Sequence, residues 1–103
     1  MSQYDNVTVI KKANQYFDGQ VTSRNLELSD GSKATLGIMN PGEFEFSTSA
    51  KERMEILNGD LLVLLPNETT WQSYSSGGVF YVPENASFQV IANSVVDYCC
   101  AYL

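Results

Sequence analysis

The chain has 103 residues, of which 44% are hydrophobic and 17% are charged, so it is long enough for one folded domain and too short for two. Its net charge is −6 at neutral pH, from 12 acidic and 6 basic side chains. Nucleic acids and anionic membrane surfaces attract basic proteins, so this charge argues against nonspecific binding of either one. One small anion held by a local lysine or arginine is compatible with it.

The residue types that are missing exclude several kinds of chemistry. The chain contains no histidine, which removes serine–histidine and cysteine–histidine nucleophiles and every histidine-based metal site. The only cysteines, Cys99 and Cys100, are adjacent, so on a strand they point to opposite faces and cannot pair with each other. We expect two buried free thiols and no structural zinc.

The sequence also favours a cytoplasmic protein without a membrane partner. No segment reaches the roughly 20 apolar residues that span a bilayer. Residues 1–6 lack the basic start and the apolar stretch of a signal peptide. Free cysteines are typical of a reducing compartment, which agrees with this expectation.

In chain order, short β-prone segments alternate with turns. Residues 1–12 predict an N-terminal arm or edge strand. Residues 13–19 predict a short turn with two aromatic residues, interpreted as a helical turn that plugs one end of the fold. Further strands are expected within residues 21–28, 33–39, 43–48, 53–57, 61–65, 69–74, 79–82, 87–92 and 95–103. About nine or ten short strands and no sustained helical period predict an all-β sandwich or barrel.

Residues 53–65 contain the clearest local pattern. Asn58 and Gly59 lie between two apolar runs and form the strongest short-range hairpin pattern, because both residues can adopt positive φ. Residues 61–65 are apolar on both faces, which is typical of a strand buried on two sides. We expect an interior hairpin with other strands wrapped around it.

The strand predicted over residues 43–48 alternates strictly between polar and apolar side chains. One face holds Glu43, Glu45 and Ser47, and the other holds Phe44, Phe46 and Thr48. A change of facing by one residue exchanges the two sets, so either the glutamates or the phenylalanines line the interior. The sequence leaves both arrangements open.

The turn residues resemble those of a cupin, a double-stranded β-helix. Gly37 with Glu43 and Glu45, and then Glu52 with Gly59, follow the spacing of the first cupin motif, with glutamates where that motif has histidines; Gly77, Pro83 and Phe88 follow the second motif. The resemblance implies one cupin-type jelly-roll barrel over residues 13–103. Carboxylates at 43, 45 and 52 are the alternative site for a hard cation. We favour no metal.

A closer resemblance extends from about residue 13 to the end. It rests on Asn14–Gly19, Gly37–Met39, Gly42–Glu43 with Phe46–Thr48, Leu64–Pro66 before Trp71–Gln72, Phe80 with Val82–Pro83, and Tyr98–Leu103. These segments resemble the small cupin family of broad-specificity pyrimidine/purine nucleoside phosphorylases. The resemblance implies an enzyme that converts a nucleoside and phosphate to ribose 1-phosphate and the free base. It implies no cofactor, only inorganic phosphate as co-substrate.

Phosphorolysis needs a cation for phosphate, an acceptor for the ribose hydroxyls and a surface for the base. The candidate catalytic residue is Glu43, as the ribose acceptor. Phosphate is assigned to Lys33, Ser47 and Thr48, with Arg24 and Arg53 as alternative cations. Lys33 is closest to the position where family relatives carry an arginine. The base is assigned to Tyr74, Phe88 and Tyr98, because an aromatic face stacks on any base.

Two other functions stay open, and one assembly is expected. A cupin of this kind can bind a nucleoside or sugar without turnover, or its barrel can simply be filled by side chains. Many apolar strands in a short chain leave apolar faces exposed, so we expect a homodimer, to which residues 7–10 contribute by strand pairing.

Overall fold

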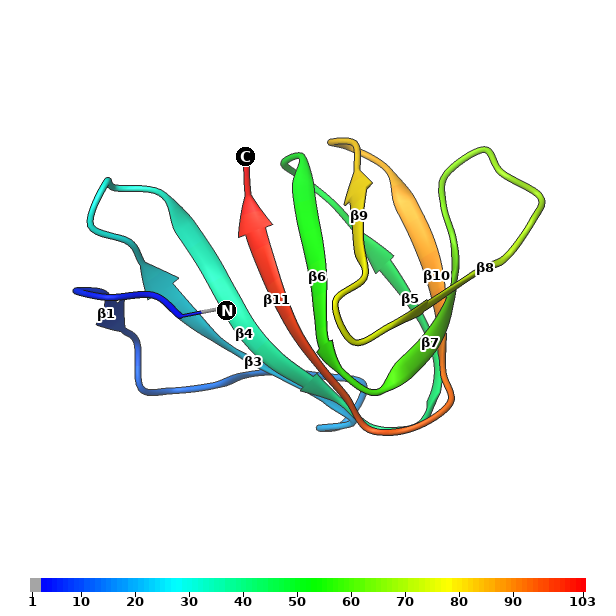
Figure 1. Ribbon diagram of the computed structural model, residues 1–103, viewed down its shortest axis with the longest axis horizontal. Helices are drawn as coiled ribbons and strands as arrows, with labels where there is room; N and C mark the ends of the chain where they lie inside the picture. The colour runs from blue at the N-terminus through cyan, green and yellow to red at the C-terminus, as the bar shows by residue number, and fades with distance from the viewer. Residues whose placement is uncertain (1–2) are drawn as a thin grey trace.

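The computed structural model describes residues 3–103 as two facing antiparallel sheets (Figure 1). The larger sheet contains β1 (Thr8–Val9), β2 (Asn14–Tyr16), β3 (Val21–Glu27), β4 (Lys33–Met39), β6 (Glu52–Asn58), β9 (Val79–Val82) and β11 (Val96–Tyr102). The smaller sheet contains β5 (Gly42–Ser47), β7 (Asp60–Leu64), β8 (Gln72–Ser75) and β10 (Ser87–Ala92). The predicted all-β, cupin-type jelly roll is confirmed, although the two sheets do not close into one continuous barrel.

The strand order brings distant segments together. It is β1-β3-β4-β11-β6-β9 in the larger sheet, where β2 also pairs with β3, and β5-β10-β7-β8 in the smaller one. The C-terminal strand β11 thus lies between β4 and β6, at the centre of the larger sheet. Of the predicted arm, residues 1 and 2 lie outside the described part, and β1 pairs with the edge of β3. Within residues 3–103, no helix is long and apolar enough to cross a membrane.

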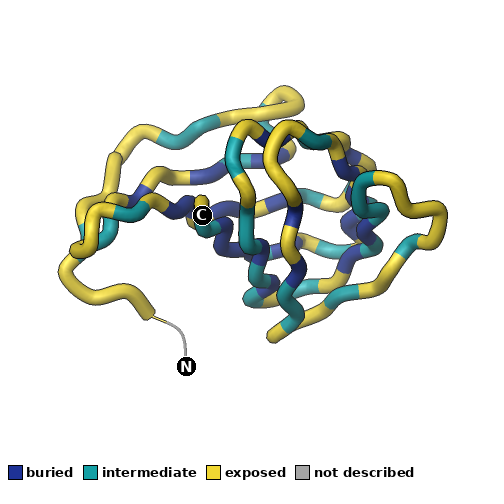
Figure 2. The backbone as a smooth tube through the Cα atoms, turned by 90° about the horizontal axis from the view of Figure 1, so that it is seen from above, coloured by how far each residue is buried: buried dark blue, intermediate teal, exposed yellow. Residues whose placement is uncertain are grey.

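The core lies between the sheets. Buried and exposed positions alternate along most strands (Figure 2), as expected where one face of a sheet is covered. The largest fully buried side chains are Met39, Ile56, Leu61, Val21, Val63, Val82, Val90 and Val96. These residues come from both sheets, so burial of their apolar surface holds the two layers together.

The hairpin predicted over residues 53–65 is wrong. β6 and β7 meet at Asn58 and Gly59 but belong to different sheets: β6 pairs with β11 and β9, and β7 pairs with β10 and β8. Of these two residues, Gly59 has a positive φ, of 90°, and Asn58 does not. A Cβ atom there would lie 2.4 Å from the carbonyl oxygen of Val95. The pair therefore forms a corner between layers, packed against the chain that enters β11.

The turn predicted over residues 13–19 is instead a short strand and a tight turn. β2 pairs with β3, and Phe17 and Asp18 after it both have positive φ. No helical turn forms, because the backbone of residues 14–16 is already hydrogen-bonded as an edge strand. The Phe17 ring packs on Phe44, with ring centroids 5.0 Å apart.

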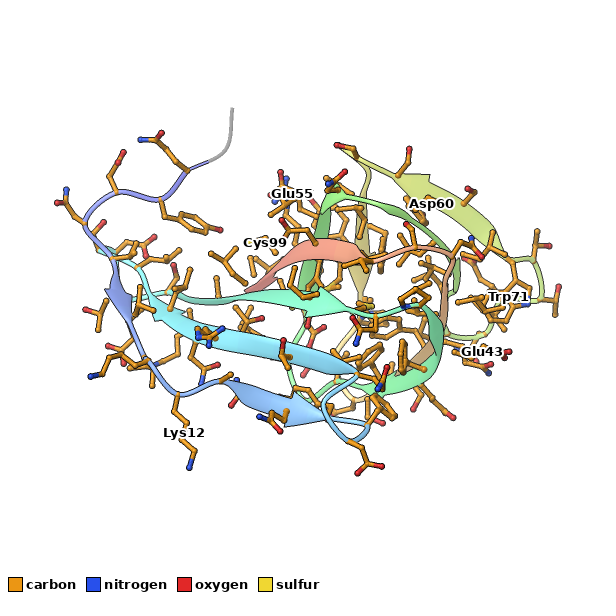
Figure 3. All side chains as sticks on the ribbon, turned by 90° about the horizontal axis from the view of Figure 1, so that it is seen from below. Lys12, Glu43, Glu55, Asp60, Trp71 and Cys99 are labelled. Atoms are coloured by element: carbon orange, nitrogen blue, oxygen red, sulfur yellow. The ribbon has the colours of Figure 1, made fainter. Side chains whose placement is uncertain are left out.

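The structure decides the facing of β5. Phe44 is buried and Phe46 packs against the core, whereas Glu43 and Glu45 are exposed. Figure 3 shows the Glu43 side chain pointing away from the space between the sheets. Of the two arrangements that the sequence leaves open, the one with the phenylalanines inward forms, and Glu43, the candidate ribose acceptor, lies outside the space between the sheets.

Candidate functional site

A cavity of about 80 Å³ opens between the two sheets. It is lined by Tyr16, Ser23, Thr35, Met39, Phe46, Glu52, Met54, Phe88, Tyr98, Cys100 and Tyr102. All but two of these residues belong to strands of the larger sheet, and Phe46 and Phe88 come from the smaller one. The cavity thus has two different walls.

The wall from the larger sheet is polar at its outer end. In register, Lys33 of β4 is opposite Tyr102 of β11, and Tyr102 is opposite Glu52 of β6. Residues directly opposite in antiparallel strands point to the same face, so these three share the interior face of the sheet. The next row inward places Thr35 opposite Cys100.

The edge strand β2 extends this polar wall. Asn14 is opposite Ser23 in register, and its Nδ2 atom donates to Ser23 Oγ at 3.2 Å and to Asn25 Oδ1 at 3.1 Å. Tyr16, two residues further along the same face, lines the cavity. Strand β2 therefore adds two interior-facing side chains, Asn14 and Tyr16, that the sequence analysis did not assign to the site.

The opposite wall is aromatic. The rings of Phe46 and Phe88 have centroids 5.5 Å apart. Phe88 also contacts Phe80 at 6.2 Å, and Phe80 contacts Tyr74 at 4.8 Å. This row of rings runs from the cavity into the core. Only Phe46 and Phe88 line the cavity and are available to a ligand bound in it.

Glu52 is the carboxylate among the cavity-lining residues. Its side chain is half-buried, and burial raises the pKa of its carboxyl group, with the Cys100 thiol beside it opposing part of this rise. Among the described residues, the side-chain ion pairs are Lys33–Glu27 and Arg53–Glu55, so no cation pairs with Glu52 there. Its environment therefore shifts the carboxyl group toward the protonated form.

Burial also raises the pKa of three other groups in the cavity lining, Tyr98, Cys100 and Tyr102. Burial raises the pKa of Tyr102 to about 12 and raises the pKa of Tyr98 well above its usual range. Burial also raises the pKa of the Cys100 thiol, which makes it a poor nucleophile because thiolate is the reactive form. Both cysteines are buried and free, as predicted, but Cys100 faces the cavity and Cys99 faces the outer side. These groups therefore offer hydrogen bonds, and Cys100 offers no thiolate nucleophile.

Tyr98 is held by a glycine on the neighbouring strand. Gly37 is directly opposite Tyr98 in register. A Cβ atom at Gly37 would lie 2.4 Å from Tyr98 Cζ and 2.6 Å from the carbonyl oxygen of Thr22. Only glycine lets the tyrosine ring lie across β4, which fixes the ring inside the cavity.

The structure brings together some of the predicted site residues. Phe88 and Tyr98 line the cavity, whereas Tyr74 lies behind it against Phe80. Lys33 is exposed at the rim, on the interior face of β4, with its Nζ atom 3.7 Å from Glu27 Oε1. It does not line the cavity itself.

The remaining predicted residues lie elsewhere. The exposed Ser47 hydroxyl is 3.3 Å from that of Ser87 on the outer side of the smaller sheet. The Thr48 hydroxyl is used by the turn before β10, where it donates to the Pro83 carbonyl oxygen at 2.7 Å and accepts from the Ala86 amide at 3.1 Å. Arg53 pairs with Glu55 at 3.8 Å, and the Arg24 Nε atom donates to the Lys11 carbonyl oxygen. None of these groups reaches the cavity.

The three carboxylates considered for a metal are not brought together. Glu43 and Glu45 are exposed on β5, whereas Glu52 faces the cavity from β6. Within residues 3–103, no group of three or more histidine, cysteine, aspartate or glutamate side chains is arranged to hold a metal ion. The Glu43/Glu45/Glu52 site is therefore wrong, because the two strands present opposite faces of their alternating pattern.

Two facing antiparallel sheets around an interior cavity define a protein of the cupin class. The fold is similar to the Cnp3 cupin domain of Schizosaccharomyces pombe, with a TM-score of 0.64 over 89% of this chain and 69% of that chain; at 20% identity the likeness concerns the fold alone. A crystal structure from Acinetobacter sp. ADP1, described as a protein of unknown function, is similar throughout. Its TM-score is 0.94 at 40% identity, over 98% of both chains.

The family follows from the sequence comparisons. Residues 11–102 match the family model described as pyrimidine/purine nucleoside phosphorylase. A relative of that name from Hydrogenovibrio crunogenus is 56% identical over 103 residues, which are 100% of this chain and 99% of the relative. This chain belongs to the pyrimidine/purine nucleoside phosphorylase family, so the resemblance noted in its motifs is confirmed.

Proposed function

We propose that this chain cleaves purine and pyrimidine nucleosides by phosphorolysis in the cavity between its two sheets. An oxygen of inorganic phosphate bonds to C1′ of the ribose while the bond from C1′ to the base nitrogen breaks, which gives ribose 1-phosphate and the free base. The activity is supported by full-length relatives that carry its name. Its location is supported by one observation: a polar wall and an aromatic wall face each other in one cavity.

The two walls suit the two halves of a nucleoside. Phe46 and Phe88 offer π-faces, which stack on purines and pyrimidines alike and so permit broad specificity. The hydroxyls of Thr35 and Tyr102 and the carboxyl group of Glu52 are within the same cavity and offer hydrogen bonds to ribose hydroxyls. Glu52 thus replaces Glu43 in the proposed site.

Phosphate is assigned to Lys33 at the rim. A dianion is not attracted by a molecule of net charge −6, so a local cation has to hold it. Lys33 shares the interior face with Tyr102 and Glu52, whereas Arg24 and Arg53 are engaged on the outer side. Lys33 is two strand spacings from Glu52, about 10 Å between backbones, which leaves room for a phosphate and a ribose between them.

The cavity has to widen for a whole nucleoside. Its volume of about 80 Å³ is well below the ~300–1,000 Å³ of most ligand pockets. Tyr16 and Tyr102 line it and are 48% and 38% exposed, so both rings lie at its mouth. We assign the opening to rotation of these two side chains, which need no movement of the buried core.

The proposal covers three further properties. The enzyme needs no metal or organic cofactor, it is located in the cytoplasm, and it forms a homodimer. Phosphorolysis through an oxocarbenium-like ribose needs hydrogen bonds and a phosphate cation, and the proposed site supplies both. Two buried free thiols suit a reducing compartment. The dimer is assigned to the outer face of the larger sheet, where Leu36, Ile38 and Tyr81 are 41%, 40% and 52% exposed.

The test is release of free base from inosine and from uridine by the purified chain after EDTA treatment. We expect release only when phosphate is present, with ribose 1-phosphate formed in equal amount. Release without phosphate would indicate a hydrolase. Saturable nucleoside binding without release would indicate a binding protein instead of an enzyme. Loss of activity with EDTA, restored by one divalent metal, would contradict the metal-free mechanism.

A further inference from the structure

The balance of protons in phosphorolysis sets a requirement that the proposed site has to meet. At neutral pH inorganic phosphate is divided between H₂PO₄⁻ and HPO₄²⁻. When HPO₄²⁻ reacts, the product ribose 1-phosphate is a dianion without its proton. The base leaves with the electron pair of the C1′–N bond and has to gain a proton to become neutral. One proton is therefore transferred in net from phosphate to base in each turnover, and a side chain positioned to carry it would speed the reaction.

We propose that Glu52 is the catalytic acid that donates this proton to the departing base. This inference rests on the proposed function and adds a role within the same cavity. As the C1′–N bond breaks, the carboxylic acid of Glu52 gives its proton to the base. As the phosphate oxygen bonds to C1′, the proton of HPO₄²⁻ returns to the carboxylate, so the acid is restored and no other reactant is consumed.

The position of Glu52 carries this assignment. It lines the cavity from β6, while the aromatic wall of Phe46 and Phe88 lines it from the other sheet. On its other side, Tyr102 separates it in register from Lys33, the proposed phosphate cation. Glu52 thus shares one cavity with the aromatic wall proposed for the base and lies in the same row of the sheet as the cation proposed for phosphate.

The surroundings of Glu52 suit an acid better than a permanent anion. The cavity-lining groups nearest to it in register, Cys100 and Tyr102, are neutral, and its carboxyl group is half-buried without a paired cation. Burial raises its pKa, which increases the protonated fraction near neutral pH. A single acid that recognises no particular ring shape also agrees with cleavage of both purines and pyrimidines.

A comparison of two leaving groups tests the role. Inosine and uridine need a proton on the departing base, whereas 7-methylguanosine carries a positive charge on its purine and leaves as a neutral base without one. With Glu52→Gln, which keeps the size and hydrogen-bonding capacity of the side chain, we expect kcat on inosine to fall about 100-fold or more. On 7-methylguanosine we expect kcat to stay within about threefold of the unchanged chain.

Two further measurements sharpen the result. Glu45→Gln, on the exposed side of β5, is the matched control and should leave both activities unchanged. In the unchanged chain, kcat/KM for inosine should fall as pH rises through the pKa of Glu52. This decrease should be absent with 7-methylguanosine over the pH range in which its purine keeps its positive charge.

The outcomes separate the two levels of the proposal. Equal losses of Glu52→Gln on both nucleosides would overturn the proton-donor role and leave Glu52 with its hydrogen bond to the ribose alone. Full activity of the variant on both would remove Glu52 from the mechanism, while the phosphorylase function would stand. If the unchanged chain releases base from neither nucleoside, the proposed function itself fails, and the acid role fails with it.

Discussion

Lys33 lies at the rim of the cavity with a weak partner. Its Nζ atom is 3.7 Å from Glu27 Oε1, and the two side chains are 67% and 52% exposed. Exposed pairs of this kind contribute between 0 and about 1 kcal/mol, so little is lost when Lys33 turns toward a phosphate. Lysine binds phosphate as a point charge, without the two-pronged contact that arginine makes.

We therefore expect Lys33→Ala to raise the KM for phosphate at least tenfold, or about 1.4 kcal/mol, with little change in the KM for nucleoside. Lys33→Arg should keep or improve phosphate use. Lys12→Ala is the control, since the Lys12 side chain points away from the sheets in Figure 3. Steady-state kinetics with varied phosphate measure the effect. An unchanged KM for phosphate in Lys33→Ala would remove Lys33 from the site.

Glu52 should also make stability depend on pH. Its pKa is raised in the folded state, so the folded chain holds this proton more tightly than the unfolded chain does. The resulting stabilisation is complete below the ordinary glutamate pKa of about 4.3 and is lost as pH rises through the raised value. Thermal unfolding should show Glu52→Gln melting higher than the unchanged chain at pH 7 to 8, with the gap closing near pH 4. A lower melting temperature for the variant at pH 7 would mean that the carboxylate is stabilised by the fold.

Part of the candidate site could be predicted from single residues. Phe88 and Tyr98 were assigned to the pocket because aromatic side chains suit a base, and both line the cavity. From the sequence we chose Glu43 for the ribose and considered Glu52 only for a metal. The inward face of a strand depends on how its sheet packs, which the sequence does not give. The side chain of Thr48 was misjudged for a related reason: its hydroxyl is already bonded to the backbone of a distant turn.

At the scale of elements, strand positions were predictable and strand partners were not. The predicted segments 33–39, 79–82 and 87–92 coincide with β4, β9 and β10, because alternation and turn residues are local properties. The Asn58–Gly59 step has the same local pattern in a hairpin and in a corner. Which one forms depends on the packing of Gly59 against Val95, and that contact joins residues far apart in the sequence.

The contact between Gly37 on β4 and Tyr98 on β11 shapes the cavity. Gly37→Ala should push the tyrosine ring and strand β4 apart, at a cost of about 1–3 kcal/mol in the free energy of unfolding. Urea denaturation measures this cost. It should shrink in a Tyr98→Ala background but not vanish, because the carbonyl oxygen of Thr22 would still lie 2.6 Å from the new Cβ atom. An unchanged unfolding midpoint for Gly37→Ala would contradict this packing.

At the scale of the whole molecule, the outer face of the larger sheet carries exposed apolar side chains beside a part that the N-terminal arm covers, where the Tyr4 hydroxyl is 3.5 Å from Cys99 Sγ. Leu36 and Ile38 of β4 are exposed there, and Figure 3 shows Glu55 and Cys99 on the same side of the sheet. Light scattering at micromolar concentration should give twice the 11.4 kDa mass of one chain. Ile38→Asp should shift the mass toward that of one chain, since a buried unpaired charge opposes association. A mass near 11.4 kDa for the unchanged protein would exclude the dimer.

Phosphorolysis is assigned to the cavity between the two sheets. A crystal structure with ribose 1-phosphate bound tests this assignment most directly. We expect the sugar between Phe88 and Tyr102, with its hydroxyls hydrogen-bonded to Glu52 or Thr35 and its phosphate within reach of Lys33. Tyr16 and Tyr102 should have rotated to widen the mouth. Ribose 1-phosphate bound on the outer face of either sheet, with the cavity unchanged, would contradict this site.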